Sequence, residues 1–173
     1  MKNHTIIEAV SGFLFCSFLM LAPAAKAETV ILACAGQEKT DYSPGLTYTP
    51  RQVSFTGQSD LSCPLLTPAV RTATIKTVGS SMQSCTPALT SATSQITINW
   101  GDGTTSIAKG TTALSTKPAG ESVITLTGNV LSGRFMGAGI VRTLTLLAPD
   151  ITLCNTTGVT HVEGPSTLVV VGL

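Results

Sequence analysis

Short runs rich in threonine, valine, isoleucine and leucine recur along the chain from residue 29 onward, and glycine, proline, serine and asparagine separate them. Such residues are enriched in β-strands and in the turns between them. No stretch of this region combines a helical period with capping residues. We therefore expect an all-β chain with strands in TVILAC (29–34), RQVSFTG (51–57), VRTATIKTV (70–78), SQITINW (94–100), TTSIAKG (104–110), SVITLTGNVL (122–131), GIVRTLTLL (139–147) and STLVVVG (166–172).

Several of these runs alternate between apolar and polar residues. In SQITINW, Ile96, Ile98 and Trp100 fall on one face, and Thr97 and Asn99 fall on the other. This period of two indicates a sheet with one buried and one wet side. About eight or nine short strands at this spacing favour an antiparallel β-sandwich of the immunoglobulin-like type, and a small β-barrel is the alternative.

The first 27 residues have the pattern of a secretory signal peptide. Lys2 precedes the apolar run GFLFCSFLMLAPA, and AKA (25–27) forms a small-x-small cleavage site before Glu28. The run is shorter than the roughly 20 residues that span a bilayer. We expect a signal peptide over 1–27 and a single secreted domain over 28–173, with no stable membrane insertion after cleavage.

Charge and cysteine content agree with this reading. From residue 28 onward eight Lys and Arg balance eight Asp and Glu without a basic cluster, which argues against a nucleic-acid partner. The same region keeps four cysteines, an even number as in disulfide-bonded secreted chains. Three pairings are possible. We favour Cys34 with Cys63 and Cys85 with Cys154, because each half of the chain then closes its own loop.

The stretch WGDG holds the one tryptophan of the chain. Asp102 and Gly103 lie between two strand-like runs, and Asp-Gly is a strong hairpin signal. Trp100 is in phase with the buried residues of its run, so we interpret Trp100, Gly101, Asp102 and Gly103 as a structural turn. A calcium or sugar site is the alternative. Calcium needs six to eight oxygens, and Asp102 has no acidic neighbour in sequence. Sugar stacking needs exposed aromatic rings, and the chain has only five aromatic residues from residue 28 onward.

Two resemblances attach to these residues. WGDG is similar to the strand-turn signature of polycystic-kidney-disease-type immunoglobulin-like domains, over four residues. More broadly, DYSPGLTYTPRQVSFTG, ITINWGDGTTS, ESVITLTGNVLSGRFMGAG and GVTHVEGPSTLVVVG resemble a group of small secreted actinobacterial proteins without an established activity. That resemblance implies an exported, disulfide-bonded β domain of bacterial origin and no catalytic residue.

The sequence contains candidate catalytic residues but no motif that supports a catalytic role for them. His161 could form a Ser-His-Asp set with Asp102 or Asp150, yet no nucleophile motif supports it. Glycosidases need two carboxyl groups at a defined separation, and the candidates are scattered: Asp41, Asp60, Glu121 and Asp150. Neither a zinc-ligand spacing nor a phosphate-binding loop is present, so we expect no cofactor.

Two surface features remain. Asn155 begins a formal glycosylation sequon. The segment SDLSCPLLTPAV (59–70) carries Leu61, Leu65 and Leu66 between prolines, either as a loop tied down by Cys63 or as a recognition loop.

Three functions of different class fit these observations. The favoured one is a secreted, non-catalytic binding domain whose loops or edge strands meet a protein or cell-envelope component. The second is a small-molecule carrier with an apolar cleft between the sheets. The third is a hydrolase with an unrecognised site, which a His161→Ala comparison would test.

Overall fold

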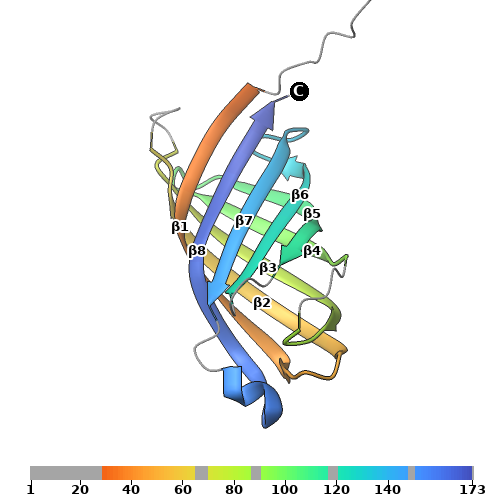
Figure 1. Cartoon of the computed structure of the whole chain (residues 1–173). Helices are drawn as coiled ribbons and strands as arrows, with labels where there is room; N and C mark the ends of the chain where they lie inside the picture. Colours follow the sequence, from red (N-terminus) through yellow and green to blue (C-terminus); the bar gives the residue numbers. More distant parts are fainter. Residues whose placement is uncertain (1–28, 65–69, 87–90, 117–120, 148–150, 173) are drawn as a thin grey trace, which may run out of the picture.

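The chain forms a closed barrel of eight antiparallel strands in the computed structural model, which describes residues 29–64, 70–86, 91–116, 121–147 and 151–172. Each strand pairs with the next along the chain, and the last strand pairs with the first (Figure 1). The strands are β1 (Thr29–Leu46), β2 (Arg51–Ser62), β3 (Thr72–Gln83), β4 (Thr93–Trp100), β5 (Thr105–Thr116), β6 (Glu121–Gly133), β7 (Gly139–Leu147) and β8 (Val159–Gly172).

The immunoglobulin-like sandwich expected from the sequence is therefore wrong, and the alternative, a β-barrel, is the fold. β1 pairs with β8 from Thr29 opposite Gly172 to Leu46 opposite Val159, with two register shifts. This ladder leaves no open sheet edge, whereas a sandwich has two separate sheets. Local periodicity in the sequence could not reveal that the barrel closes, because closure depends on pairing between the two ends of the described chain.

Each of the eight strand-like runs overlaps a strand, although β3 begins two residues and β5 one residue after the start of its run. Several strands are much longer than their runs. β1 has 18 residues and continues beyond TVILAC through GQEKTDYSPGL. β8 begins at Val159, ahead of the STLVVVG run. These extensions contain glycine, proline and charged residues, which have low strand propensity. Pairing with both neighbouring strands extends them against that local preference.

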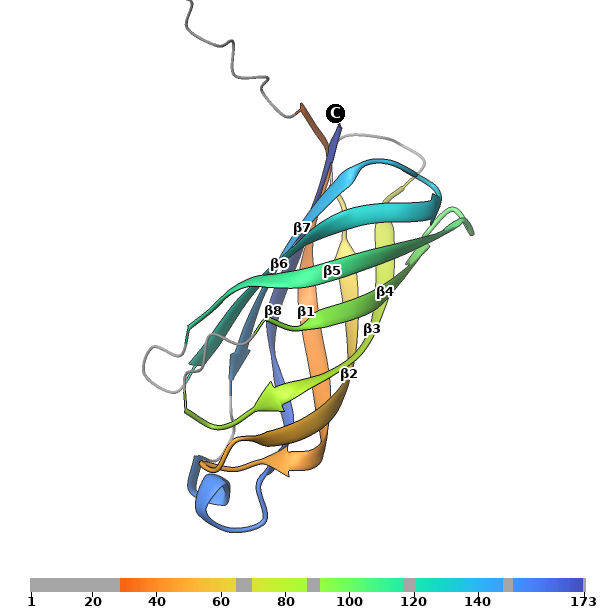
Figure 2. The same ribbon diagram turned by 90° about the vertical axis from the view of Figure 1, so that its right-hand side faces the viewer.

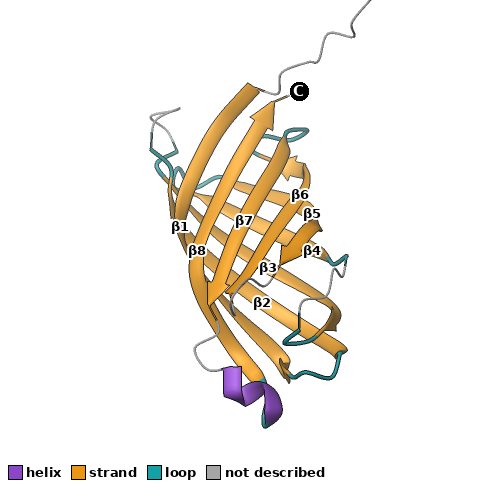
Figure 3. Ribbon diagram, viewed as in Figure 1, coloured by secondary structure: helices purple, strands orange, loops and turns teal. Residues whose placement is uncertain are grey.

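The barrel has two distinct ends (Figure 2). The turn after Trp100, the turn after Gly133, the start of β1 and the end of β8 lie at the upper end of Figure 1. The short 3-10 helix η2 (Ile151–Asn155) lies at the lower end, beside the β1–β2 turn (Figure 3). Within the described residues no helix is long and apolar enough to cross a membrane.

The interior holds two apolar clusters that follow the length of the barrel. The upper cluster surrounds Trp100 and the lower cluster surrounds Tyr42. Successive inward positions along each strand supply these side chains, as the period of two requires. The upper cluster includes Leu32, Ile75, Ile98, Ile140 and Leu168, and the lower one includes Val53, Leu126, Leu144, Leu146 and Val159.

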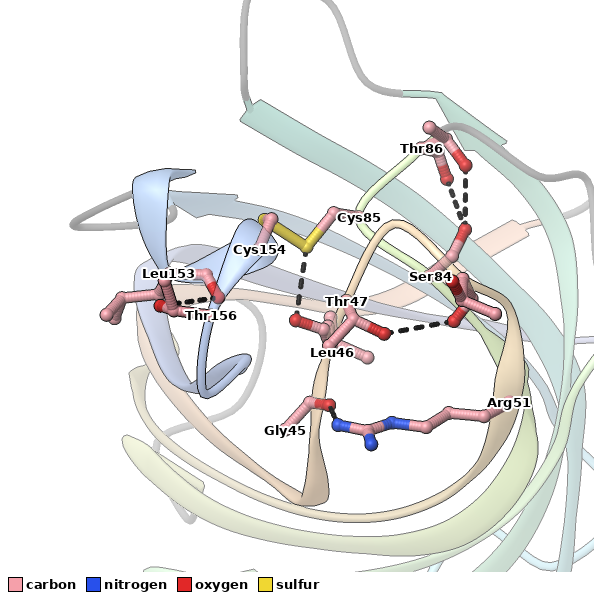
Figure 4. The surroundings of a disulfide bond; sticks show 11 residues. Gly45, Leu46, Thr47, Arg51, Ser84, Cys85, Thr86, Leu153, Cys154 and Thr156 are labelled. Carbon is pink, nitrogen blue, oxygen red and sulfur yellow. Dashed lines mark hydrogen bonds between the residues drawn. A yellow bond between two sulfur atoms is a disulfide. The ribbon is translucent and has the colours of Figure 1, made fainter.

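Both disulfides form with the favoured pairing. Cys34 and Cys63 join the neighbouring strands β1 and β2, with a Cα–Cα distance of 4.1 Å. Cys85 follows β3 and joins Cys154 of η2 over a separation of 69 residues. Figure 4 shows this second bridge between η2 and Cys85, with Leu46 and Thr47 beside it. The backbone N–H of Cys85 donates to the carbonyl oxygen of Thr47 at 2.8 Å.

Removing the second bridge should destabilise the barrel strongly. Replacing Cys85 and Cys154 together by alanine should lower the free energy of unfolding by up to about 4.5 kcal/mol, because the unfolded chain regains the freedom of a long loop. Denaturant unfolding of the oxidised protein and of the double variant measures this difference. Equal unfolding midpoints for the two would contradict a stabilising role for the bridge.

Candidate functional site

A buried ion pair crosses the middle of the barrel interior. Arg142 of β7 donates from Nη2 to Oε2 of Glu38 of β1 at 2.6 Å, and their side chains are 0% and 1% exposed. Arg142 also donates from Nη1 to Oγ1 of Thr77 at 2.6 Å. Glu38 accepts hydrogen bonds from Thr40 at 3.0 Å and from Ser59. The interior polar cluster consists of Glu38, Thr40, Ser59, Thr77, Arg142 and Ser166, whose hydroxyl lies 3.2 Å from that of Ser59.

The interior polar cluster compensates two buried charges. Burial lowers the pKa of Arg142 below its usual value, and the charge and hydrogen bond of Glu38 act in the opposite direction. A buried charge is tolerated when it is paired and hydrogen bonded; both Nη atoms of Arg142 have partners, while its Nε has none among the described residues. Because its members come from β1, β2, β3, β7 and β8, the cluster links strands around the barrel.

A small cavity lies beside Glu38 in the lower half of the interior. Its volume is about 50 Å³, and Tyr42, Phe55, Gln83 and Leu144 are among the residues that line it. A cavity of this size has room for a few water molecules, whereas ligand pockets usually measure about 300–1,000 Å³. Burial, followed by the negative charge of Glu38, raises the pKa of the Tyr42 hydroxyl above its usual range. The interior is filled by its own side chains.

The WGDG stretch forms the corner between β4 and β5. The backbone N–H of Gly103 donates to the carbonyl oxygen of Trp100 at 2.9 Å, and Gly103 has a φ of 85°, which favours glycine. Asp102 accepts from the backbone N–H of Thr104 at 2.9 Å and from its hydroxyl at 2.6 Å. These two bonds, together with the charge of Arg134, hold the pKa of Asp102 below its usual value.

The same corner closes the upper end of the barrel. Trp100 is 3% exposed and donates from Nε1 to the hydroxyl of Ser106 at 2.8 Å. The ring of Phe135 meets the Trp100 ring edge to face at 5.2 Å, and the guanidinium of Arg134 lies 5.0 Å from the Phe135 ring. Arg134 also pairs with Asp102. The Asp102 carboxylate is thus engaged by the turn itself, and the part of the chain that the structure describes holds no group of three side chains suited to a metal ion.

A polar groove lies on the outer wall of the barrel. It crosses β8, β1, β2 and β3 and has a volume of about 540 Å³. We call it the charged groove, after its charged lining residues: Lys39, Asp41, Asp60, Lys76 and His161. The register of the strand pairing brings these residues together; for example, Asp41 of β1 is paired directly with His161 of β8.

His161 contacts two exposed carboxylates within the charged groove. Its Nδ1 lies 2.7 Å from Oδ1 of Asp41, and its Nε2 lies 4.0 Å from Oε2 of Glu163. The side chains of His161 and Asp41 are 45% and 69% exposed. A Ser-His-Asp set needs a nucleophile hydrogen bonded to the second ring nitrogen; here a carboxylate faces that nitrogen instead. Asp102 lies in the upper corner, and Asp150 lies outside the described residues.

Two of the candidate carboxylates, Asp41 and Asp60, line the charged groove. Asp41 pairs with Thr56 and Asp60 with Gln37, so their backbones are roughly 13 Å apart along the strands. Asp41 contacts His161 of β8, while Asp60 accepts a hydrogen bond from Thr74 of β3 at 3.0 Å, so the two carboxylates have partners on opposite neighbouring strands. Glu121 lies at the start of β6, away from both.

Of the candidate interaction residues Leu61, Leu65 and Leu66, only Leu61 is among the described residues. Leu61 is 4% exposed and lies in the upper apolar cluster, because it occupies an inward position of β2. It is therefore not available as an exposed anchor. Leu65 and Leu66 fall outside the described residues. Asn155 is exposed at the end of η2.

Comparison with known proteins adds no assignment: no family model, no curated protein and no solved structure matches this chain.

Breaking the buried ion pair should cost much stability. Glu38→Gln should lower the free energy of unfolding by about 3–5 kcal/mol, because the Arg142 guanidinium stays charged and buried without its counter-ion. Replacing both residues, Glu38→Leu with Arg142→Met, should recover most of that loss. Denaturant unfolding of the three proteins measures both effects. Lys39→Gln, which changes the neighbouring outward residue, is the control, and an equal loss in that variant would argue against the ion pair.

The buried Tyr42 hydroxyl should resist ionisation. In a Tyr48→Phe variant, which leaves Tyr42 as the tyrosine of the barrel, no tyrosinate absorbance should develop before the protein unfolds at alkaline pH. The raised pKa makes the contribution of Tyr42 to stability fully present below the ordinary tyrosine value of about 10 and progressively lost as pH rises above it. Ultraviolet absorbance and circular dichroism, followed together against pH, test this. Tyrosinate absorbance in the still folded protein would contradict it.

Proposed function

We propose that this chain is an exported, non-catalytic binding domain that holds a polar segment of a protein in the extracellular space or the cell envelope. The observation that carries the proposal is the gathering of charged side chains around the charged groove. The partner would contribute charges of both signs, since the groove combines Lys39 and Lys76 with Asp41 and Asp60. Hydrogen bonds and ion pairs would set its orientation.

Export is supported by two independent features. Residues 1–27 have the pattern of a signal peptide, although they lie outside the described residues. Both disulfides of the barrel are of the kind that persists in oxidising compartments. From residue 28 onward the chain has equal numbers of basic and acidic residues, which argues for a protein partner over a nucleic acid.

The closed sheet changes where a partner could bind. A barrel has no free strand edge, so a partner cannot extend the sheet by adding a strand. The interior cavity of about 50 Å³ is too small for a carried organic molecule. The outer wall and the turns remain as binding surfaces, and the charged groove is a hollow of the outer wall in which side chains of both charges gather.

Charge reversal in the groove tests this proposal. The chain, fixed to a resin, is exposed to the culture fluid and envelope proteins of its own host, and the same experiment is run with a Lys39→Glu, Lys76→Glu variant. We expect a protein that the original chain retains at low salt, that the variant loses, and that salt releases. Its affinity for the isolated partner should fall about tenfold or more in the variant.

Arg71→Glu is the matched control, because Arg71 is an exposed cation before β3 that does not line the charged groove. Equal retention of the partner by the original chain and the groove variant would refute the charged groove as the binding site. Loss of the partner in the control variant alone would place the binding site outside the charged groove. A His161→Ala comparison in hydrolase assays addresses catalysis separately, and an activity lost in that variant would overturn the non-catalytic reading.

A further inference from the structure

The outer wall formed by β4, β5, β6 and β7 is nearly free of charge. Among the described outward-facing residues of these strands, Lys109 and Glu121 are the charged ones. We call this outer surface of β4–β7 the neutral wall. Its middle presents Val123, Thr125, Thr127, Val141, Thr143 and Thr145. Depletion of charged residues is the compositional mark of the core of a protein–protein interface.

The two charges lie at opposite ends of the neutral wall. Lys109 pairs with Asn129 near the upper end, and Glu121 pairs with Leu147 at the lower end. Along β6, Asn129 and Glu121 are roughly 27 Å apart. Thr125 stands midway between them and pairs with Thr143.

The two ends of the neutral wall also differ in the shape of their apolar surface. At the upper end, a groove of about 560 Å³ lies on the wall, with Lys109, Leu131 and Gly139 among its lining residues. Gly139 is paired with Asn129 and offers no side chain there. At the lower end, Leu147 projects with 44% of its surface exposed. The upper end of the wall therefore has a hollow, a cation and the exposed side chain of Leu131 at its border, and the lower end has the exposed side chain of Leu147 and an anion.

We infer that the neutral wall is a self-association surface, on which a second copy of this chain packs around a two-fold axis passing near Thr125. Such an axis exchanges the two ends of the wall. Glu121 of each copy then meets Lys109 of the other, and Leu147 of each copy enters the groove above Gly139 of the other. The contact is isologous, as in most symmetric dimers.

Charge favours a second copy as the occupant. The two described charges of the wall are of opposite sign, so the surface is complementary to itself under a two-fold rotation and would attract neither a basic nor an acidic partner strongly. This inference does not depend on the charged groove, which lies on other strands.

A charge swap tests the inference. Sedimentation velocity of the exported chain, purified with its disulfides intact, should show a monomer–dimer equilibrium between about 1 and 500 µM. Lys109→Glu should weaken the dimer about tenfold or more, since two acidic groups then face each other at two symmetric places. Glu121→Lys should have the same effect for the opposite reason. The double variant Lys109→Glu, Glu121→Lys should restore the original dissociation constant.

Lys76→Glu is the control, because it makes the same change in the charged groove and should leave the dimer unaltered. Circular dichroism and melting confirm that each variant is folded. A chain that stays monomeric over the whole range overturns the inference, as does a dimer that the single variants leave unchanged. A dimer that both single variants weaken but that the double variant does not restore also overturns it, because the two charges then do not face each other. These outcomes concern the isolated chain, so they are separate from any failure to find a partner for the charged groove.

Discussion

Pairing between β1 and β8 is the interaction on which the rest of the molecule depends. It turns an eight-stranded meander into a tube with a fixed interior, an outer wall and no edge. Once the tube is closed, every inward position has a limited volume to fill, and every outward position has defined neighbours across two ladders. The charged groove and the neutral wall are both products of that register, since the strands bring together residues far apart in the sequence.

Closure also explains why a full ion pair lies in the core. Inward positions of eight strands meet around one axis, so an inward Glu38 and an inward Arg142 can reach each other although 104 residues separate them. The pair divides the apolar interior into an upper and a lower cluster. Replacing such a pair by apolar residues often costs little, while leaving one member alone costs much. Glu38 and Arg142 therefore constrain which residues the neighbouring inward positions can tolerate.

Much of the local structure could be read from the sequence, and the long-range structure could not. The alternation of Ile96, Ile98 and Trp100 predicted the buried face of β4, and an even set of cysteines predicted two disulfides. The sandwich was favoured because strand count and spacing are shared by sandwiches and barrels. Arg142 had a detectable signal, since it is in phase with Ile140 and Leu144 in GIVRTLTLL. Glu38 had none, because its segment contains residues that usually form turns.

The position of the ends of the barrel has a further consequence. The first residue of β1, Thr29, is paired with Gly172 at the end of β8 (Figure 1). Any segment attached before β1 or after β8 therefore leaves the molecule from the same rim, opposite the disulfide-linked η2. A domain or tag fused at either terminus would therefore stand at that rim, away from η2, and would leave the middle of the barrel wall uncovered.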